Sequence, residues 1–143
     1  MSVQQLVEGE CNNPFGLLGC HLDGGRGLVN AFIPGAEAIY LKTGAPGRPR
    51  RLRQQHPAGV FSTGVLPAEK LKDYQLLVQY PAGRFLKQDP YRFPSLLKEG
   101  DVWLFSEGRH ETAWTFLGAH VCENEGVTGV QFVIWAPNAR RVA

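Results

Sequence analysis

The chain has 143 residues, enough for one domain and part of another, and 43% of them are apolar, which is sufficient for a buried core. A formal charge of +2 is too close to zero to indicate nucleic acid or an anionic membrane as a partner. Residues 1–25 hold no Lys or Arg, and no apolar stretch approaches the ~18 residues of a membrane span, so we expect a cytoplasmic protein that is neither exported nor anchored.

The first ninety residues predict strands rather than long helices. Seventeen glycines and ten prolines separate short apolar runs, which is typical of an all-β sandwich. At the start, residues 2–8 predict one or two helical turns at most. A strand is predicted over 28–33, and the Pro34-Gly35 turn that follows predicts a hairpin with a second strand over 38–41.

Two further strands follow. Residues 59–65 combine β-branched and aromatic side chains between glycines, which favours a strand. Residues 74–80 alternate apolar and polar side chains and predict a strand with one buried face. The Pro81-Ala82-Gly83 turn predicts a hairpin between this strand and residues 84–87.

From Asp89 onward the pattern changes. Apolar residues cluster within 95–107 and 109–116, which predicts two short helices or helical turns that link two domains. Gly108 and Gly118 are placed as the C-caps of these helices.

A motif occurs twice. Leu18-Gly19-Cys20-His21 precedes the apolar run 29–36, and Leu117-Gly118-Ala119-His120 precedes the similar run 132–139. The offset is 99 residues at the leucines and 103 at the prolines of the two runs, so we expect a loop four residues longer in the second copy. His21 and His120 are equivalent, which predicts a shared structural role such as a bond to a turn carbonyl.

The repeat indicates a duplicated module whose second copy stops after its opening strand. We therefore expect the chain to be the front end of a larger protein. The apolar strand at 130–136 would lack its sandwich partners, and we expect it to dock on the first domain, pair with another molecule or stay mobile.

Four arginines lie in residues 48–53. One interpretation is a phosphate-binding site, because arginine clusters hold phosphates. The other is a solvated loop or edge strand whose charges discourage aggregation between sheets. We favour the edge strand, because no aromatic residue separates the arginines as in nucleic-acid-binding segments.

Nothing in the sequence indicates a metal, cofactor or catalytic site. The four histidines are scattered, and Cys11, Cys20 and Cys122 form no Cys-x-x-Cys pair, so we expect reduced thiols and no metal. No pair of carboxylates can be assigned as acid and base without a fold.

Aromatic side chains are the one route to sugar binding, because the apolar face of a pyranose stacks on an aromatic ring while amides bind its hydroxyls. The candidates are Tyr40, Tyr74, Tyr80, Tyr91, Trp103, Trp114 and Trp135. Most of them are expected in the core, including Tyr74, Tyr80 and Trp135. For Asp89-Pro90-Tyr91 we favour a turn in which Asp89 bonds nearby amides over a sugar platform.

In their order and spacing, seven motifs resemble the N-terminal region of bacterial 1,4-α-glucan (glycogen) branching enzymes, which belong to the α-amylase superfamily. The motifs are those at 14–21, 31–36, 59–61, 89–93, 104–110, 117–120 and 132–142. The match covers nearly the whole chain after residue 12.

The resemblance implies an all-β architecture in which an immunoglobulin-like β-sandwich precedes a second sandwich of carbohydrate-binding-module type and then a catalytic barrel. The expected parts are an N-terminal arm at 1–13, the first sandwich at 14–88, a partly helical linker at 89–116 and the start of the second sandwich at 117–143.

The resemblance also implies that the parent enzyme cleaves α-1,4-glucan through a covalent glycosyl intermediate and rejoins the chain by an α-1,6 bond. Its catalytic carboxylates would lie beyond Ala143, so this chain is expected to be inactive and to need no cofactor or metal. The expected partners are α-glucan and the later domains of the same chain.

The leading hypothesis is an accessory domain that supports or weakly binds glucan and influences the length of the transferred chain. The candidate glucan contacts are Tyr91, Trp103 and Trp114. The alternatives are a purely structural packing module of the same enzyme, or the first module of a related debranching enzyme or trehalose-releasing hydrolase.

Overall fold

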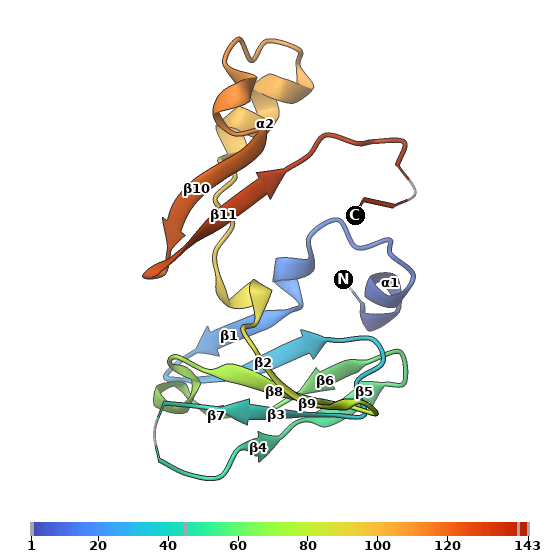
Figure 1. Ribbon diagram of the computed structural model, residues 1–143, viewed down its shortest axis with the longest axis vertical. Helices are drawn as coiled ribbons and strands as arrows, with labels where there is room; N and C mark the ends of the chain where they lie inside the picture. The colour runs from blue at the N-terminus through green and yellow to red at the C-terminus, as the bar shows by residue number, and fades with distance from the viewer. Residues whose placement is uncertain (1, 45, 140, 143) are drawn as a thin grey trace. The chain divides into compact units, whose positions relative to one another are not determined.

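In the computed structural model, two antiparallel sheets face each other across an apolar core within the first of two compact units, 1–92 and 93–143 (Figure 1). The structure describes residues 2–44, 46–139 and 141–142. Met1 of the expected arm, Ala45 of the arginine-rich loop, and Arg140 and Ala143 of the expected second sandwich therefore lie outside the described residues.

The first sheet has the order β1-β2-β6-β5, with β7 also paired to β2, and the second has the order β4-β3-β8-β9. The strands of the first sheet are β1 (Gly19–Asp23), β2 (Arg26–Phe32), β5 (Arg53–His56), β6 (Val60–Ser62) and β7 (Leu66–Pro67). Those of the second are β3 (Ala38–Lys42), β4 (Arg50–Arg51), β8 (Gln75–Tyr80) and β9 (Gly83–Lys87). The unit also contains α1 (Val3–Val7) and the 3-10 turns η1 (Pro14–Gly16), η2 (Ala68–Leu71) and η3 (Pro90–Arg92).

The core follows from alternation along the strands. Val29 and Ala31 of β2 and Leu76 and Val78 of β8 point into the space between the sheets and are buried, while their neighbours in sequence are more exposed. Ile39 of β3 completes this layer. The prediction of an all-β sandwich is confirmed.

The predicted hairpin between 28–33 and 38–41 is wrong, because these segments lie in opposite sheets. Ile33 donates its N–H to the Gly59 carbonyl at 2.8 Å in the first sheet, whereas Glu37 donates to the Gln79 carbonyl at 2.9 Å in the second. The Pro34-Gly35 turn therefore carries the chain across the core, so that Val29 and Ile39 face each other from two layers.

Other local predictions are confirmed. β6 lies within 59–65, the strand predicted at 74–80 corresponds to β8, and β8 pairs with β9 as the predicted hairpin. The N-terminal helical turn is α1, which Ser2 caps by accepting a hydrogen bond from the Gln5 backbone N–H. The arginine-rich segment supplies β4, which lies at the edge of its sheet, as we favoured.

The second unit contains one helix and one hairpin. Its elements are α2 (Glu99–Ser106), the 3-10 turn η4 (Ala113–Thr115), β10 (Gly118–Asn124) and β11 (Val127–Val133). Gly108 ends α2 with a φ of 67°, as predicted for a C-cap. The second predicted segment forms the single helical turn η4, but Gly118 begins β10 instead of capping a helix.

The strand expected at 130–136 is not left without a partner: β11 pairs with β10 along its full length. The expected lack of a backbone partner was wrong, because the second copy carries its own hairpin partner, whereas the packing of the strand's apolar face stays a prediction. The two hairpins also correct the expected longer loop. The turn of each hairpin has two residues. The first hairpin extends from its turn to the Gly19–Asn30 pair, and the second extends to the equivalent Gly118–Val133 pair. The four additional residues of the second copy therefore lengthen its two strands rather than its loop.

The equivalent histidines do not share one role. The His120 Nε2 atom lies 2.9 Å from the Leu117 carbonyl, as predicted, but the buried His21 Nε2 atom has no hydrogen-bond partner in the part of the chain that the structure describes. Within the described residues, no helix is long and apolar enough to cross a membrane.

Candidate functional site

The three candidate sugar contacts lie in different units. Tyr91 belongs to η3 in the first unit, whereas Trp103 of α2 and Trp114 of η4 belong to the second.

Tyr91 is half-buried at the end of the sandwich. Its ring meets the Phe15 ring edge-on, with centroids 5.2 Å apart, and packs against a small cluster of Leu6, Leu18 and Val60. Burial raises the pKa of the Tyr91 phenol, and the charges of Asp89 and Cys11 raise it further.

The position of Tyr91 depends on a buried hydrogen bond. Asp89 is 1% exposed and accepts the Tyr74 hydroxyl at 2.5 Å and the Tyr91 backbone N–H at 3.0 Å. The second bond confirms the predicted turn around Pro90. Burial raises the pKa of the Asp89 carboxyl, and the two hydrogen bonds oppose this effect without cancelling it.

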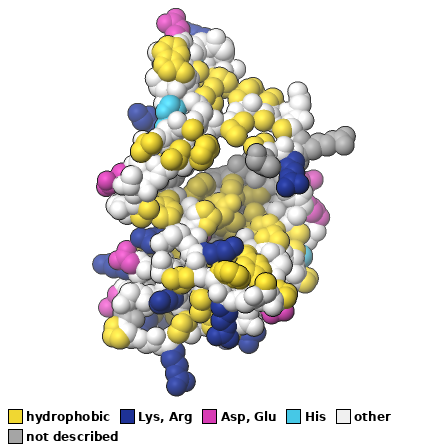
Figure 2. All heavy atoms as spheres, in the orientation of Figure 1, with side chains coloured by type: hydrophobic (Ala, Val, Ile, Leu, Met, Phe, Trp, Pro, Cys, Tyr) yellow, Lys and Arg dark blue, Asp and Glu magenta, His cyan; other side chains and the backbone are white. Residues whose placement is uncertain are grey.

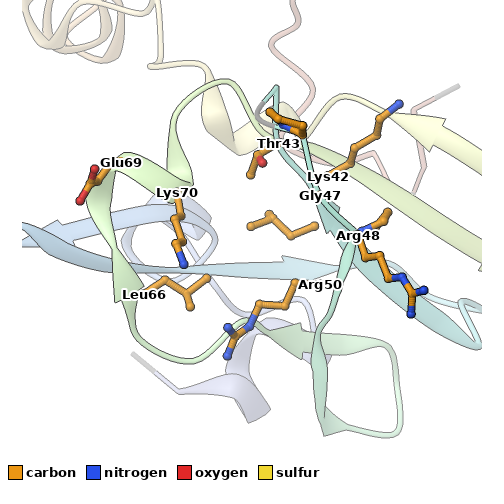
Figure 3. Close-up of a pocket in the computed structure, with 11 residues that line it drawn as sticks. Lys42, Thr43, Gly47, Arg48, Arg50, Leu66, Glu69 and Lys70 are labelled. Carbon is orange, nitrogen blue, oxygen red and sulfur yellow. The ribbon is translucent and has the colours of Figure 1, made fainter.

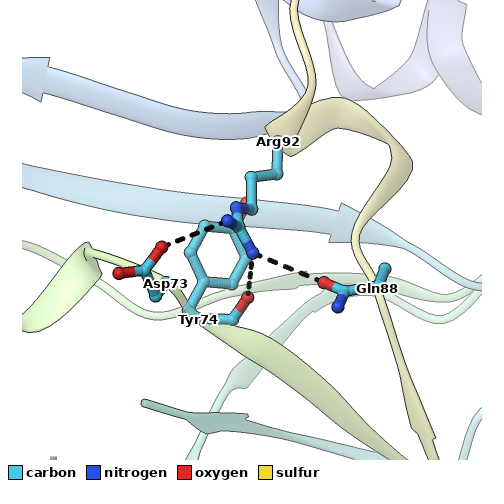
Figure 4. Close-up of polar contacts among 4 residues, drawn as sticks. All are labelled: Asp73, Tyr74, Gln88 and Arg92. Carbon is cyan, nitrogen blue, oxygen red and sulfur yellow. Dashed lines mark hydrogen bonds and ion pairs between the residues drawn. The ribbon is translucent and has the colours of Figure 1, made fainter. Parts of the chain in front are cut away.

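Arg92 ties η3 to the second sheet. Its guanidinium reaches Asp73 at 3.2 Å, the Tyr74 carbonyl at 3.5 Å and the Gln88 side-chain oxygen at 3.4 Å (Figure 4). Asp73 is mostly exposed, so this ion pair contributes little by itself. Together the contacts fix η3 at the open end of the β8–β9 hairpin, where β8 begins and β9 ends.

A cavity of about 230 Å³ lies beside Tyr91. Lys87 and Gln88 line its wall together with the apolar side chains of Phe32 and Leu76, while the Lys87 ammonium bonds the Tyr80 hydroxyl outside the lining. An aromatic ring and an amide beside an apolar surface can hold one sugar ring. Sequence reasoning missed Lys87 and Gln88, because neither has a pattern that marks it.

The two tryptophans present open ring faces. Trp103 is 56% exposed and Trp114 is 68% exposed. No residue of α2 is buried, so Trp103 lies on a helix surface that is accessible over most of its circumference. Rings of this kind can stack on a pyranose without rearrangement of the fold.

Trp135, which was expected in the core, is also exposed and packs only in part. Its ring meets Phe105 edge-on at 5.3 Å, and Phe105 meets Phe116 at 5.9 Å. His110 joins this aromatic group through Phe116 and bonds Asp101 at 3.0 Å. These contacts hold the unit together around α2, and only the clustering of apolar residues at 95–116 anticipated them.

In the described parts of the chain, no three His, Cys, Asp or Glu side chains are placed to hold a metal ion. Cys20 and Cys122 are thiols, and burial raises the pKa of Cys20.

Comparison with known proteins identifies the family. The family model for the N-terminal domain of the alpha-1,4-glucan branching enzyme GlgB matches residues 1–91. The chain belongs to this family. It is 40% identical over 144 residues to the 1,4-alpha-glucan branching enzyme GlgB of Rubrobacter xylanophilus, and the match covers 99% of this chain and 19% of that protein.

A second GlgB branching enzyme, from Cupriavidus pinatubonensis, is 45% identical over 141 residues, which is 96% of this chain and 18% of that protein. The chain thus spans about a fifth of the length of these relatives. Among solved structures, a pullulanase type I from Bacillus subtilis, complexed with maltose, is similar over 99% of this chain and 17% of the pullulanase chain. The sequence identity is 13% and the TM-score is 0.41. That likeness is too low to support an argument.

The Tyr74–Asp89 pair gives a prediction about pH. Because the pKa of Asp89 is higher in the folded state than in the unfolded chain, the stability linked to this group is present below the unfolded pKa and is lost as the pH rises through the folded pKa. We expect Asp89→Asn to reduce this loss. Urea unfolding of both proteins from pH 3 to 8 measures this loss of stability. Identical pH profiles of the two proteins would contradict the prediction.

Tyr74→Phe should destabilise the first unit by about 1–3 kcal/mol at neutral pH, because it leaves a buried carboxylate oxygen without its donor. Tyr80→Phe is the matched control, since the Tyr80 hydroxyl accepts only an exposed bond from Lys87. Equal losses in urea unfolding would show that the buried bond is not special.

Gly19 gives a further prediction. A Cβ at Gly19 would lie 2.4 Å from the Tyr91 carbonyl oxygen, and its φ is +86°. Gly19→Ala should cost about 1–3 kcal/mol more than Gly35→Ala, which has a similar φ but open space around it. Thermal unfolding of the two variants tests this, and similar melting temperatures would contradict the close approach of η3 to β1.

Proposed function

We propose that the chain is the non-catalytic N-terminal part of a 1,4-α-glucan branching enzyme, which transfers α-1,4-glucan segments to form α-1,6 branches. The observation that carries the proposal is the family match over residues 1–91, together with about 40% identity to branching enzymes along nearly the whole chain. Catalysis is assigned to the part of the enzyme that the chain does not span.

We propose the domain division 1–13, 14–88, 89–116 and 117–143, with the last segment as the start of a second sandwich. The duplicated hairpins support it. Phe132 of β11 is the counterpart of Val29 of β2, yet Phe132 is 69% exposed where Val29 is fully buried. Figure 2 shows hydrophobic side chains on the surface of the β10–β11 hairpin, as expected if a further sheet covers it in the complete enzyme.

We propose direct but weak glucan binding through the exposed rings of Trp103 and Trp114, with Tyr91 and its neighbouring cavity as a further contact. Three separate aromatic surfaces favour a long polymer that touches several places over a small free ligand. The Cys20 and Cys122 thiols agree with a cytoplasmic location.

The alternative of a purely structural packing module makes the opposite prediction about glucan. The alternative of a debranching enzyme or trehalose-releasing hydrolase is set aside, because the family model and the relatives described above are those of branching enzymes.

Titration of the chain with maltoheptaose tests glucan binding. We expect chemical-shift changes at millimolar sugar centred on the tryptophan rings, and at least a threefold weaker apparent affinity in Trp103→Ala and Trp114→Ala, since loss of one stacked ring costs about 1 kcal/mol. Val102→Ala is the matched control, because it removes exposed apolar surface from the same helix without removing a ring. Absence of shifts would contradict glucan binding and support the purely structural packing module.

The influence on chain length is tested in the complete enzyme. We expect removal of residues 1–92 to preserve α-1,6 bond formation and to change the length distribution of transferred chains, measured after debranching of the product. An unchanged distribution would contradict an accessory role in chain selection, and complete loss of branching would contradict the assignment of catalysis to the rest of the enzyme.

A further inference from the structure

A second cavity lies in the first unit, at the open edge between the two sheets. It has a volume of about 610 Å³ and is lined by residues of β3, β4, β7, η2 and the loop between β3 and β4 (Figure 3). Its floor is apolar, because Leu41 and Leu66 are core residues whose outer surface faces it.

The wall of this cavity is strongly basic. Four cationic side chains line it, whereas Glu69 is the one acidic residue among the lining residues that the structure describes. The whole chain has almost as many acidic as basic residues, 13 against 15, so this concentration is local. The four cations are Lys42, Arg48, Arg50 and Lys70.

These charges are not neutralised within the fold. Among the described residues, no carboxylate lies within ion-pair distance of any of the four cations. Figure 3 shows the ends of Lys70 and Arg50 on the Leu66 side of the cavity, while Lys42 and Arg48 extend outward and the Glu69 carboxylate points away. The inner pair is therefore placed to contact an anion, and the outer pair raises the potential at the entrance.

The shape of the cavity favours a ligand larger than a bare ion. Pro46 and Pro49 restrict the backbone of the loop that forms one wall, so part of the site is preformed. The Thr43 side chain adds a hydroxyl to the wall. An apolar floor beside paired cationic donors suits a ring-shaped body that carries an anionic group.

We propose that this cavity binds a phosphate monoester carried on a body the size of a sugar ring. Arg50 and Lys70 hold the phosphate oxygens through charge-assisted hydrogen bonds, and the sugar body lies over Leu41 and Leu66. The site is separate from the proposed glucan contacts, and the proposal does not depend on them.

The test is a titration of the chain, followed by chemical shifts, with glucose 1-phosphate, inorganic phosphate and glucose as three separate probes. We expect glucose 1-phosphate to bind most tightly, with shifts at the residues that line the cavity, and to bind less tightly as salt concentration rises. Arg50→Gln and Lys70→Gln should each weaken its binding about tenfold.

Arg51→Gln is the matched control. It makes the same change of charge at the next position of β4, but Arg51 lines a different cavity with Leu52 and Arg53. Its binding of glucose 1-phosphate should stay within about twofold of the parent protein. Circular dichroism of all three variants checks that the sandwich is retained.

Absence of binding by glucose 1-phosphate would overturn the proposal. An equal loss of affinity for glucose 1-phosphate in Arg51→Gln would overturn it as well, because the loss would then depend on the overall charge of the chain and not on the cavity. Binding of inorganic phosphate as tight as that of glucose 1-phosphate would overturn the role of the apolar floor, and equal binding of glucose would overturn the role of the cations.

Discussion

A β-sheet with one apolar face is stable in water only when a second layer covers that face, and this requirement organises the whole chain. In the first unit Val29 and Phe61 from one sheet meet Ile39 and Val78 from the other, and all four are buried. The β10–β11 hairpin meets the same requirement only in part. It pairs its backbone groups within the hairpin, yet it leaves apolar side chains in solvent. Hydrogen bonding and burial are thus separate conditions, and two strands meet only the first.

The Tyr74–Asp89 bond connects this core to the surface that follows it. Tyr74 lies just before β8 and is buried with the core, while Asp89 follows β9 and orients η3 through the Tyr91 N–H. A buried carboxylate is costly unless its oxygens are bonded, so the bond holds the chain in one path after the sandwich. The backbone of Tyr91 is placed by this polar contact and by the absence of a side chain at Gly19, which allows the Tyr91 carbonyl to lie close to β1.

Several of these features could be predicted from the sequence because they depend on neighbouring residues. Alternation identified β8, the Pro-Ala-Gly turn identified the β8–β9 hairpin, and the repeated Leu-Gly-x-His motif identified two equivalent segments, although it did not predict that each is a hairpin. The crossing from β2 to β3 could not be predicted in this way. A Pro-Gly turn between two apolar runs is compatible with one sheet or with two, and contacts with β6 and β8 decide between them. The cavities depend on still longer separations: Lys42 and Lys70 line one cavity only because β3 and η2 border the same opening.

The arginine-rich segment shows why two interpretations of one motif need not exclude each other. An edge strand needs charge along its rim to prevent pairing with another sheet, whereas a binding cavity needs charge directed toward its interior. Side chains of successive residues in a strand point to opposite faces. Arg50 therefore lines the cavity beside its pairing partner Leu41, while Arg51 lies on the other face of β4. A strand of two arginines can thus protect an exposed edge and serve an anion site, which composition alone does not distinguish.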